Sequence, residues 1–159
     1  MSDSTTNKEL YFINTRSLEY LEIQFVPPSL NFKRNTDTQN VVIIGKNNPL
    51  YQYPAGEKLL VFELDFCAIE ENRQDVKRRV DWLESLTYNE AYEEPPDTVK
   101  LVWGRMMKNQ RWIVKNFDAK LDLFDKQYGW YPRQAYVNLT LGLDTRYNPV
   151  NKSDILNGR

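Results

Sequence analysis

The sequence predicts an α+β fold, in which a mainly antiparallel β sandwich or split barrel carries one flanking α-helix. Two patterns lead to this prediction. Most apolar segments alternate with polar residues, as half-buried strands do, and a single segment repeats its apolar residues at helical spacing. Parallel strands need long, usually helical crossovers, so a single helix leaves little room for them. With 159 residues, of which 41% are hydrophobic, the chain has the size of one domain.

The N-terminal part predicts two short strands separated by a corner. Leu21, Ile23 and Phe25 fall on one face of a predicted strand over residues 20–25. The Pro27-Pro28 pair ends it, because neither residue can donate a backbone hydrogen bond. A second short strand is predicted over residues 30–34.

A long excursion precedes the strongest strand pattern. Residues 41–44 form a β-branched run that a glycine closes, and residues 46–56 are rich in turn residues with two tyrosines among them. We therefore predict an extended excursion or a long hairpin over residues 41–56. Residues 58–66 alternate without interruption and predict a strand. Leu59 and Val61 on its second face are apolar too, so we expect half of that face to be covered.

One helix follows residue 72. Asn72 can cap its N-terminus, and Asp75 falls in the first turn, where a negative charge is favourable. Val76, Val80 and Leu83 repeat at helical spacing, which predicts one amphipathic helix lying on the sheet.

Three strands complete the predicted domain, over residues 99–103, 111–123 and 135–143. A hairpin turn is expected over residues 104–109 and an aromatic loop over residues 126–132. The alternation in residues 135–143 is complete, so a slip of one residue would expose every apolar side chain of that strand. The chain is thus divided into a polar tail (1–17), one β domain (18–143) and a second polar tail (144–159).

The composition excludes several kinds of chemistry. The chain contains no histidine, which removes the usual general base near neutral pH and the commonest transition-metal ligand. We expect no enzymatic activity, no catalytic residues, no cofactor and no metal. The formal net charge of -1 disfavours a dedicated binder of nucleic acid or anionic lipid, and no segment is long and apolar enough to predict a membrane helix. The lone Cys67 forms no internal disulfide and is interpreted as an inert buried thiol.

Aromatic residues on predicted loops are the best candidates for binding. Aromatic side chains bury much area at modest entropic cost and are enriched in protein interfaces. The interface candidates are Tyr51, Tyr53, Tyr88, Tyr92, Tyr128, Trp130 and Tyr131. A rival hypothesis is an OB-like barrel that holds single-stranded nucleic acid through Trp103, Trp112 and the basic turn between them. The alternative for that turn is a hairpin whose tryptophans pack in the core.

Several segments, in a fixed order, resemble the N-terminal domain of contractile injection system tube proteins. The segments are the run Leu21–Arg34, Gly56-Glu57 leading into Leu60–Phe66, Pro95-Pro96, Val102-Trp103-Gly104, Phe124-Asp125 and Pro132–Leu141. Each is a weak motif, and their shared order over residues 18–143 carries the resemblance. Two features depart from the family pattern: Val26 stands where an asparagine is common, and residues 88–94 look like a local enlargement.

The resemblance implies a tail-tube-like fold and a structural role. It implies a homo-oligomeric ring, as a hexamer, that joins the tail tube of a contractile phage tail or related injection system to the baseplate hub. The implied partners are further copies of this chain, the tail tube protein, and baseplate hub and spike proteins. Nucleic acid would at most pass through the channel. The implied location is the virion tail, after synthesis in the host cytoplasm.

Overall fold

The computed structural model describes residues 10–34, 39–41, 50–52, 58–68, 74–88, 95–107 and 110–144. These residues form one antiparallel sheet of seven strands, in the order β2-β1-β7-β8-β9-β6-β3, with a single helix packed against it. The strands are β1 (Leu10–Asn14), β2 (Tyr20–Glu22), β3 (Asn31–Arg34), β6 (Lys58–Cys67), β7 (Thr98–Trp103), β8 (Arg111–Asp125) and β9 (Tyr131–Leu143). The helix is α1 (Gln74–Ser85). The predicted α+β class is confirmed.

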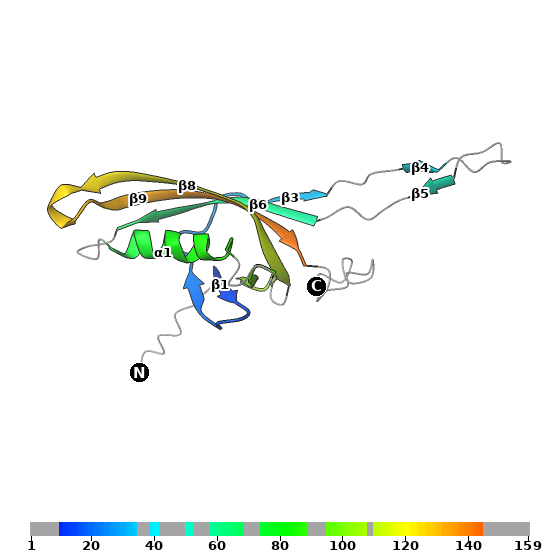
Figure 1. Ribbon diagram of the computed structural model, residues 1–159, viewed down its shortest axis with the longest axis horizontal. Helices are drawn as coiled ribbons and strands as arrows, with labels where there is room; N and C mark the ends of the chain where they lie inside the picture. The colour runs from blue at the N-terminus through cyan, green and yellow to red at the C-terminus, as the bar shows by residue number, and fades with distance from the viewer. Residues whose placement is uncertain are drawn as a thin grey trace.

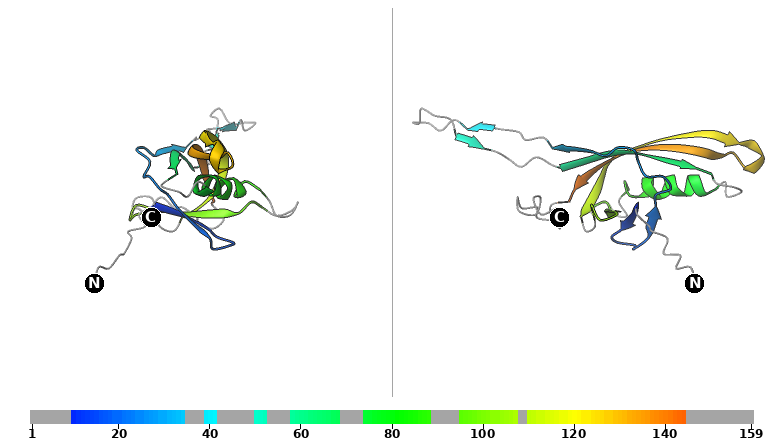
Figure 2. Two further views of the ribbon diagram at one scale, coloured as in Figure 1. Left: turned by 90° about the vertical axis from the view of Figure 1, so that its left-hand side faces the viewer. Right: turned by 180° about the vertical axis from the view of Figure 1, so that it is seen from behind.

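The sheet curls around its helix. The long strands β6, β9 and β8 form one layer, while β7, β1 and β2 turn away from it and lie on the opposite side of α1 (Figures 1 and 2). The turn starts at a register shift in β8 between Val114 and Asn116. An extra residue of this kind bends a strand and increases its twist. The result is an open sheet that wraps the helix without closing into a barrel.

The core fills the space inside this curl. We call the face of the β6–β9–β8 layer that points toward α1, β1 and β7 the inner face. The cross-strand rows Leu60–Leu141–Val114 and Leu64–Val137–Ala119 lie on it. Val76, Val80 and Leu83 of α1 are also buried, as their helical spacing predicted. The opposite, outer face of the same strands carries mostly polar residues, including Glu63, Asp65 and Asn138.

The structure contains one strand that the sequence analysis missed. β1 lies inside residues 1–17, which were interpreted as a polar tail. Its Leu10 and Phe12 are buried, at 3% and 1% exposed, and the whole strand pairs with β7. The interpretation of residues 10–14 as tail was therefore wrong, because an alternating five-residue segment is short and its partner lies almost 90 residues away in the sequence.

The remaining predicted elements occur close to their predicted positions. β2 is shorter than the predicted 20–25 strand, and β9 starts before residue 135. Within the predicted excursion 41–56, β5 (Leu50–Gln52) pairs antiparallel with β4 (Gln39–Val41) in a separate two-stranded sheet. This sheet lies beyond the ends of β3 and β6 (Figure 1). Asn72 and residues 145–159 lie outside the described residues. Apart from residues 10–14, the division into a domain and two tails stays a prediction.

Candidate assembly interface

The first open border of the sheet is β3. All four of its residues are exposed, and among the described residues no strand pairs with the edge of β3 that points away from β6. Phe32 is 49% exposed, and the ammonium of Lys58 lies over its ring at 4.9 Å from the centroid. Burial lowers the pKa of Lys58 from its ordinary value, and the neighbouring positive charge of Arg34 lowers it further. The border is thus both apolar and crowded with positive charge.

The second open border is the far part of β8. β8 has 15 residues, yet β7 pairs with it only from Arg111 to Ile113. Beyond the bulge, residues 116–124 have β9 on one side and, in the part of the chain that the structure describes, no strand on the other. Unpaired strand borders present rows of backbone donors and acceptors that another strand can complete.

On a comparable border of β6, one residue is covered within the chain. Val61 is the last residue of β6 that pairs with β3, and farther along the strand the side chain of Gln24 takes the place of a pairing strand at Cys67. The Cys67 backbone N–H donates to Gln24 Oε1 at 2.9 Å, and Gln24 Nε2 donates to the Cys67 carbonyl at 3.0 Å. A side-chain amide thus satisfies the backbone at Cys67, and on the far border of β8 the side chain of Asp122 accepts from the Leu123 N–H at 2.9 Å.

The tip of the β8–β9 hairpin exposes a cluster of large apolar side chains. Leu123, Phe124, Tyr128 and Trp130 are between 52% and 61% exposed. The turn itself is well ordered by hydrogen bonds: Asp125 accepts from the Gln127 N–H, and Arg133 donates to Asp125 through two nitrogens, at 3.2 and 2.9 Å. We call the four exposed side chains the tip cluster.

Backbone strain accompanies the tip cluster. Leu123 and Trp130 have φ values of 56° and 65°, a left-handed conformation that costs a bulky residue about 1 kcal/mol or more. Gly129 between them, at φ 73°, adopts the same region without that cost. The chain thus holds two large apolar residues in unfavourable conformations at a solvent-exposed turn.

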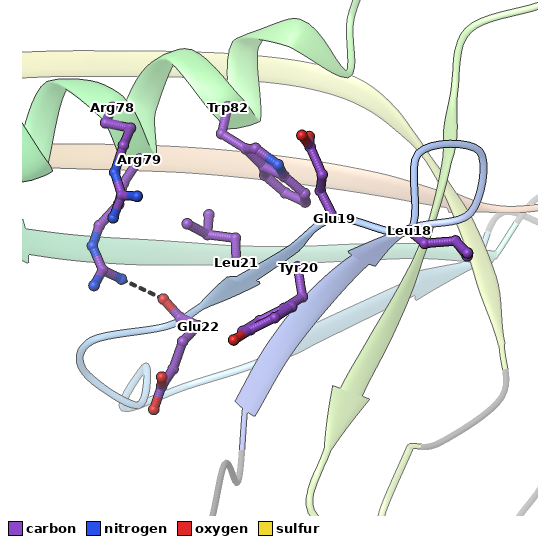
Figure 3. A pocket seen from close by; sticks show the side chains of 8 residues that line it. All are labelled: Leu18, Glu19, Tyr20, Leu21, Glu22, Arg78, Arg79 and Trp82. Atoms are coloured by element: carbon purple, nitrogen blue, oxygen red, sulfur yellow. Dashed lines mark hydrogen bonds between the residues drawn. The ribbon is translucent and has the colours of Figure 1, made fainter.

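A groove of about 670 Å³ lies between β2 and α1. Trp82 reaches down from the helix toward β2, Leu21 points up from the strand, and Arg79 donates to the carbonyl of Glu22 (Figure 3). Arg79 also donates to Asp75 at 2.8 Å, so its guanidinium ties the helix start to the sheet border. The groove is lined by both acidic and basic side chains, so it favours neither an anionic nor a cationic ligand; these side chains are Glu19, Glu22, Arg78 and Arg79.

The outer face of the β6–β9–β8 layer carries a second hollow, of about 410 Å³. Glu63, Asp118, Lys120, Tyr136 and Asn138 line it. Among the described residues, no group of three His, Cys, Asp or Glu side chains could hold a metal ion. No helix in that same part of the chain is long and apolar enough to cross a membrane.

The structure places some of the seven interface candidates at the surface and leaves others undescribed. Tyr88 is 66% exposed at the end of α1, and Tyr128 and Trp130 belong to the tip cluster, with Tyr131 half-buried beside them. Tyr53 and Tyr92 lie outside the described residues, as does the side chain of Tyr51. The tip cluster also includes Leu123, which the sequence analysis placed at the end of the predicted strand 111–123, and Phe124, which it assigned to no element. Their exposure could not be read from a pattern that only records apolar identity.

The tryptophans of the rival nucleic-acid hypothesis do not form a surface platform. Trp112 is fully buried, and Trp103 makes an edge contact with Phe62, with ring centroids 6.2 Å apart. The interpretation in which the tryptophans of this hairpin pack into the core is therefore confirmed for Trp112. The buried Nε1 of Trp112 has no hydrogen-bond partner among the described residues.

Comparison with known proteins adds one structural likeness. No family model matches the chain, and a search of curated proteins finds no match. Among solved structures, the chain is similar to the crystal structure of SPP1 Dit (gp 19.1), described as a paradigm of the hub adsorption apparatus in phages that infect Gram-positive hosts. The TM-score is 0.49 at 9% identity, over 85% of this chain and 49% of that one. The chain thus spans about half the length of SPP1 Dit, and a likeness of this size carries no argument about function.

Proposed function

We propose that this protein is a structural, non-enzymatic component of a contractile phage tail or a related injection system. In this proposal copies of the chain form a ring, of six if the resembled family is a guide, that joins the tail tube to the baseplate hub. Its partners are further copies of itself, the tail tube protein, and hub and spike proteins. Its place of action is the virion tail.

The observation that carries the proposal is the unfinished sheet. β3 and the far part of β8 lie at opposite sides of the same layer, and within the described chain neither has a strand neighbour on its outward side. Soluble monomers usually protect such borders, because they invite pairing with other chains. Exposed Phe32 at one border and the tip cluster at the other add apolar surface that water solvates poorly. A subunit that is completed by its neighbours accounts for both features.

The sequence resemblance supports the kind of assembly. Its segments fall on β2, β3, β6, β7 and β9 and on the last two residues of β8, so it spans most of the elements that build the sheet. The rival function, binding of single-stranded nucleic acid, requires exposed tryptophans for stacking on bases. Trp112 is buried and cannot take this role. Salt-dependent binding of an oligonucleotide, weakened by replacing an exposed aromatic residue, would revive it.

The test is assembly with the proposed partners. The full chain is co-expressed with tail tube and baseplate proteins from the same genome, and particles are examined by negative-stain electron microscopy and light scattering. We expect rings or tails that contain this chain. Trp130→Ala should reduce its incorporation, whereas Lys126→Ala, an exposed polar change in the same turn, should not. A chain that stays monomeric at every concentration and never enters tails would refute the proposal.

A further inference from the structure

We propose that residues 145–156 pass along a polar hollow beside β7 and place Ile155 and Leu156 in the groove between β2 and α1 of the same copy. The proposal concerns a single chain, so it goes beyond the assembly proposed above and does not depend on it. The docking surface is the groove that Leu21 and Trp82 line, and its occupant is a named stretch of this chain outside the described residues.

The entrance of the groove holds apolar side chains in water. Leu18 and Tyr20 are 75% and 58% exposed, and Leu18 has a φ of 62°, a left-handed conformation that is unfavourable for a bulky residue. The turn that carries Leu18 is fixed by hydrogen bonds. The Leu18 N–H donates to the Asn14 carbonyl at 3.0 Å, and the Asn14 N–H donates to the Glu19 carbonyl at 2.8 Å. A fixed turn that holds an apolar residue away from the core is expected where another apolar group covers it.

The last described residue, Asp144, lies near this groove along the sheet. Its N–H donates to the carbonyl of Arg111 at 3.0 Å, so Asp144 continues β9 beside the first residue of β8. Arg111 lies opposite Lys100 of β7. Lys100 lies opposite Ile13 of β1, which lies opposite Tyr20 of β2. Asp144 and Tyr20 are therefore four strand spacings apart, about 19 Å measured along the sheet.

The chain beyond Asp144 can cover this distance within one copy. Ile155 follows Asp144 by 11 residues (155 − 144), which span at most about 36 Å at roughly 3.3 Å per residue. This reach is about twice the path along the sheet, so full extension is not needed. A segment tethered at such a distance meets the groove of its own copy at an effective concentration on the order of millimolar, which favours that groove over the groove of a second copy.

A polar hollow of about 220 Å³ lies on the way from Asp144 to the groove. Its lining includes Arg111, which Asp144 adjoins, and it also includes Thr15 and Arg16, which precede the turn that carries Leu18. The hollow therefore adjoins the start of the proposed path at one residue and the entrance of the groove at two others. Its polar side chains suit a stretch of chain whose backbone needs hydrogen-bond partners.

The residue order of the segment matches the order of the two hollows. Residues 145–148 all carry hydrogen-bonding side chains, which suit the polar hollow. Ile155 and Leu156 are adjacent aliphatic residues, and burying them against Leu21 and Trp82 removes apolar surface from water. The segment also carries one charge of each sign in Lys152 and Asp154, and the groove has two acidic and two basic side chains to meet them.

Intramolecular cysteine cross-linking tests the docking. In a Cys67→Ser background, the dilute full-length chain carries Leu18→Cys and Ile155→Cys and is oxidised mildly in air. We expect a monomer that runs faster on non-reducing gels and is lighter by the hydrogens lost from the two thiols. The matched control joins Ile155→Cys to Leu123→Cys, because Leu123 is also an exposed leucine at positive φ, but at the hairpin tip. The control should give a yield at least about fivefold lower.

Hydrogen exchange gives a second readout that needs no new cysteine. Replacing Ile155→Ser and Leu156→Ser together should speed exchange in residues 18–22 about threefold or more, measured by mass spectrometry, and leave residues 117–124 unchanged. Equal yields for the two cysteine pairs, or unchanged exchange in residues 18–22, would overturn the inference. A disulfide that joins two chains would also overturn it, because the occupant would then be a second copy. Each of these results leaves the proposed function standing.

Discussion

Phe62 joins the two layers of the curled sheet, and its removal offers a sharp test of the core. It is 4% exposed on β6, its ring stacks on Phe12 of β1 with centroids 6.1 Å apart, and it meets Trp103 of β7 edge-on. These contacts span from the β6–β9–β8 layer to the strands on the other side. Phe62→Ala would leave a cavity between two parts of the sheet that the bulge in β8 bends toward each other.

The expected loss follows from burial. Truncating a buried phenylalanine to alanine costs about 3–5 kcal/mol, which includes the loss of its aromatic pairs. Phe32 on the neighbouring strand provides a matched control, because it is the same residue at 49% exposure. Phe32→Ala leaves no enclosed cavity and loses a partly exposed contact with Lys58, so about 1 kcal/mol is expected. Phe62→Leu, which fills most of the space, should fall between the two.

Urea denaturation followed by circular dichroism measures these differences. The transitions are recorded at several low protein concentrations, because assembly would otherwise add to the apparent stability. A loss of about 4 kcal/mol would be a large share of the roughly 5–15 kcal/mol typical of a domain, so Phe62→Ala is expected to be only marginally folded. If Phe62→Ala cost no more than Phe32→Ala, the two layers would not be joined in the way described.

Three further predictions concern the start of α1, the contact of Gln24 with β6 and the tip cluster. Burial raises the pKa of Asp75, but hydrogen bonds and positive charge from Arg79 and Arg78 outweigh this effect and hold the pKa below its ordinary value of 3.8. The stability that Asp75 contributes is therefore present above pH 3.8 and is lost as the pH falls through the pKa of the folded state. Thermal unfolding across that range should show Asp75→Asn about 1 kcal/mol less stable at neutral pH and without this loss in acid. Gln24→Ala should cost about 1–2 kcal/mol and speed hydrogen exchange at the Cys67 amide by at least tenfold, read by mass spectrometry. Trp130→Ala should change the unfolding free energy of the monomer by less than about 1 kcal/mol while lowering its incorporation into tails, since the side chain is 61% exposed.

The elements with strong local patterns could be predicted from the sequence. β6, α1 and β9 follow from alternation or helical spacing that every residue in the segment supports, and burial in the structure matches those patterns. The neighbours of each strand could not be predicted, because pairing such as that of β1 with β7 depends on contacts between residues far apart in sequence. The same limit hid β1 itself, whose five residues form a strand against a distant partner.

The bulge in β8 did leave a signal in the sequence. The inward-facing residues are Trp112 and Val114 before the bulge but Phe117, Ala119 and Leu121 after it, so the alternation changes phase within one segment. The segment was interpreted as a single strand over residues 111–123, which ends two residues before β8 does and misses the bend. A phase change inside an apolar alternation is what an inserted residue produces, because two residues then oppose one. Read in this way, the pattern would have predicted a turn in the sheet.

That single irregularity links the fold to the proposed assembly. The bulge follows Ile113, the last residue of β8 that pairs with β7. The first residue of β7, Thr98, is the partner of Ile113, and Pro95-Pro96 precede it, so within the described chain no strand continues beside residues 116–124. The bend carries β7 and β1 under the helix, where Phe12 and Phe62 meet. The bend that builds the core and the border that we assign to neighbouring subunits therefore meet at one place in β8, and a change that straightened the strand would be expected to disturb both.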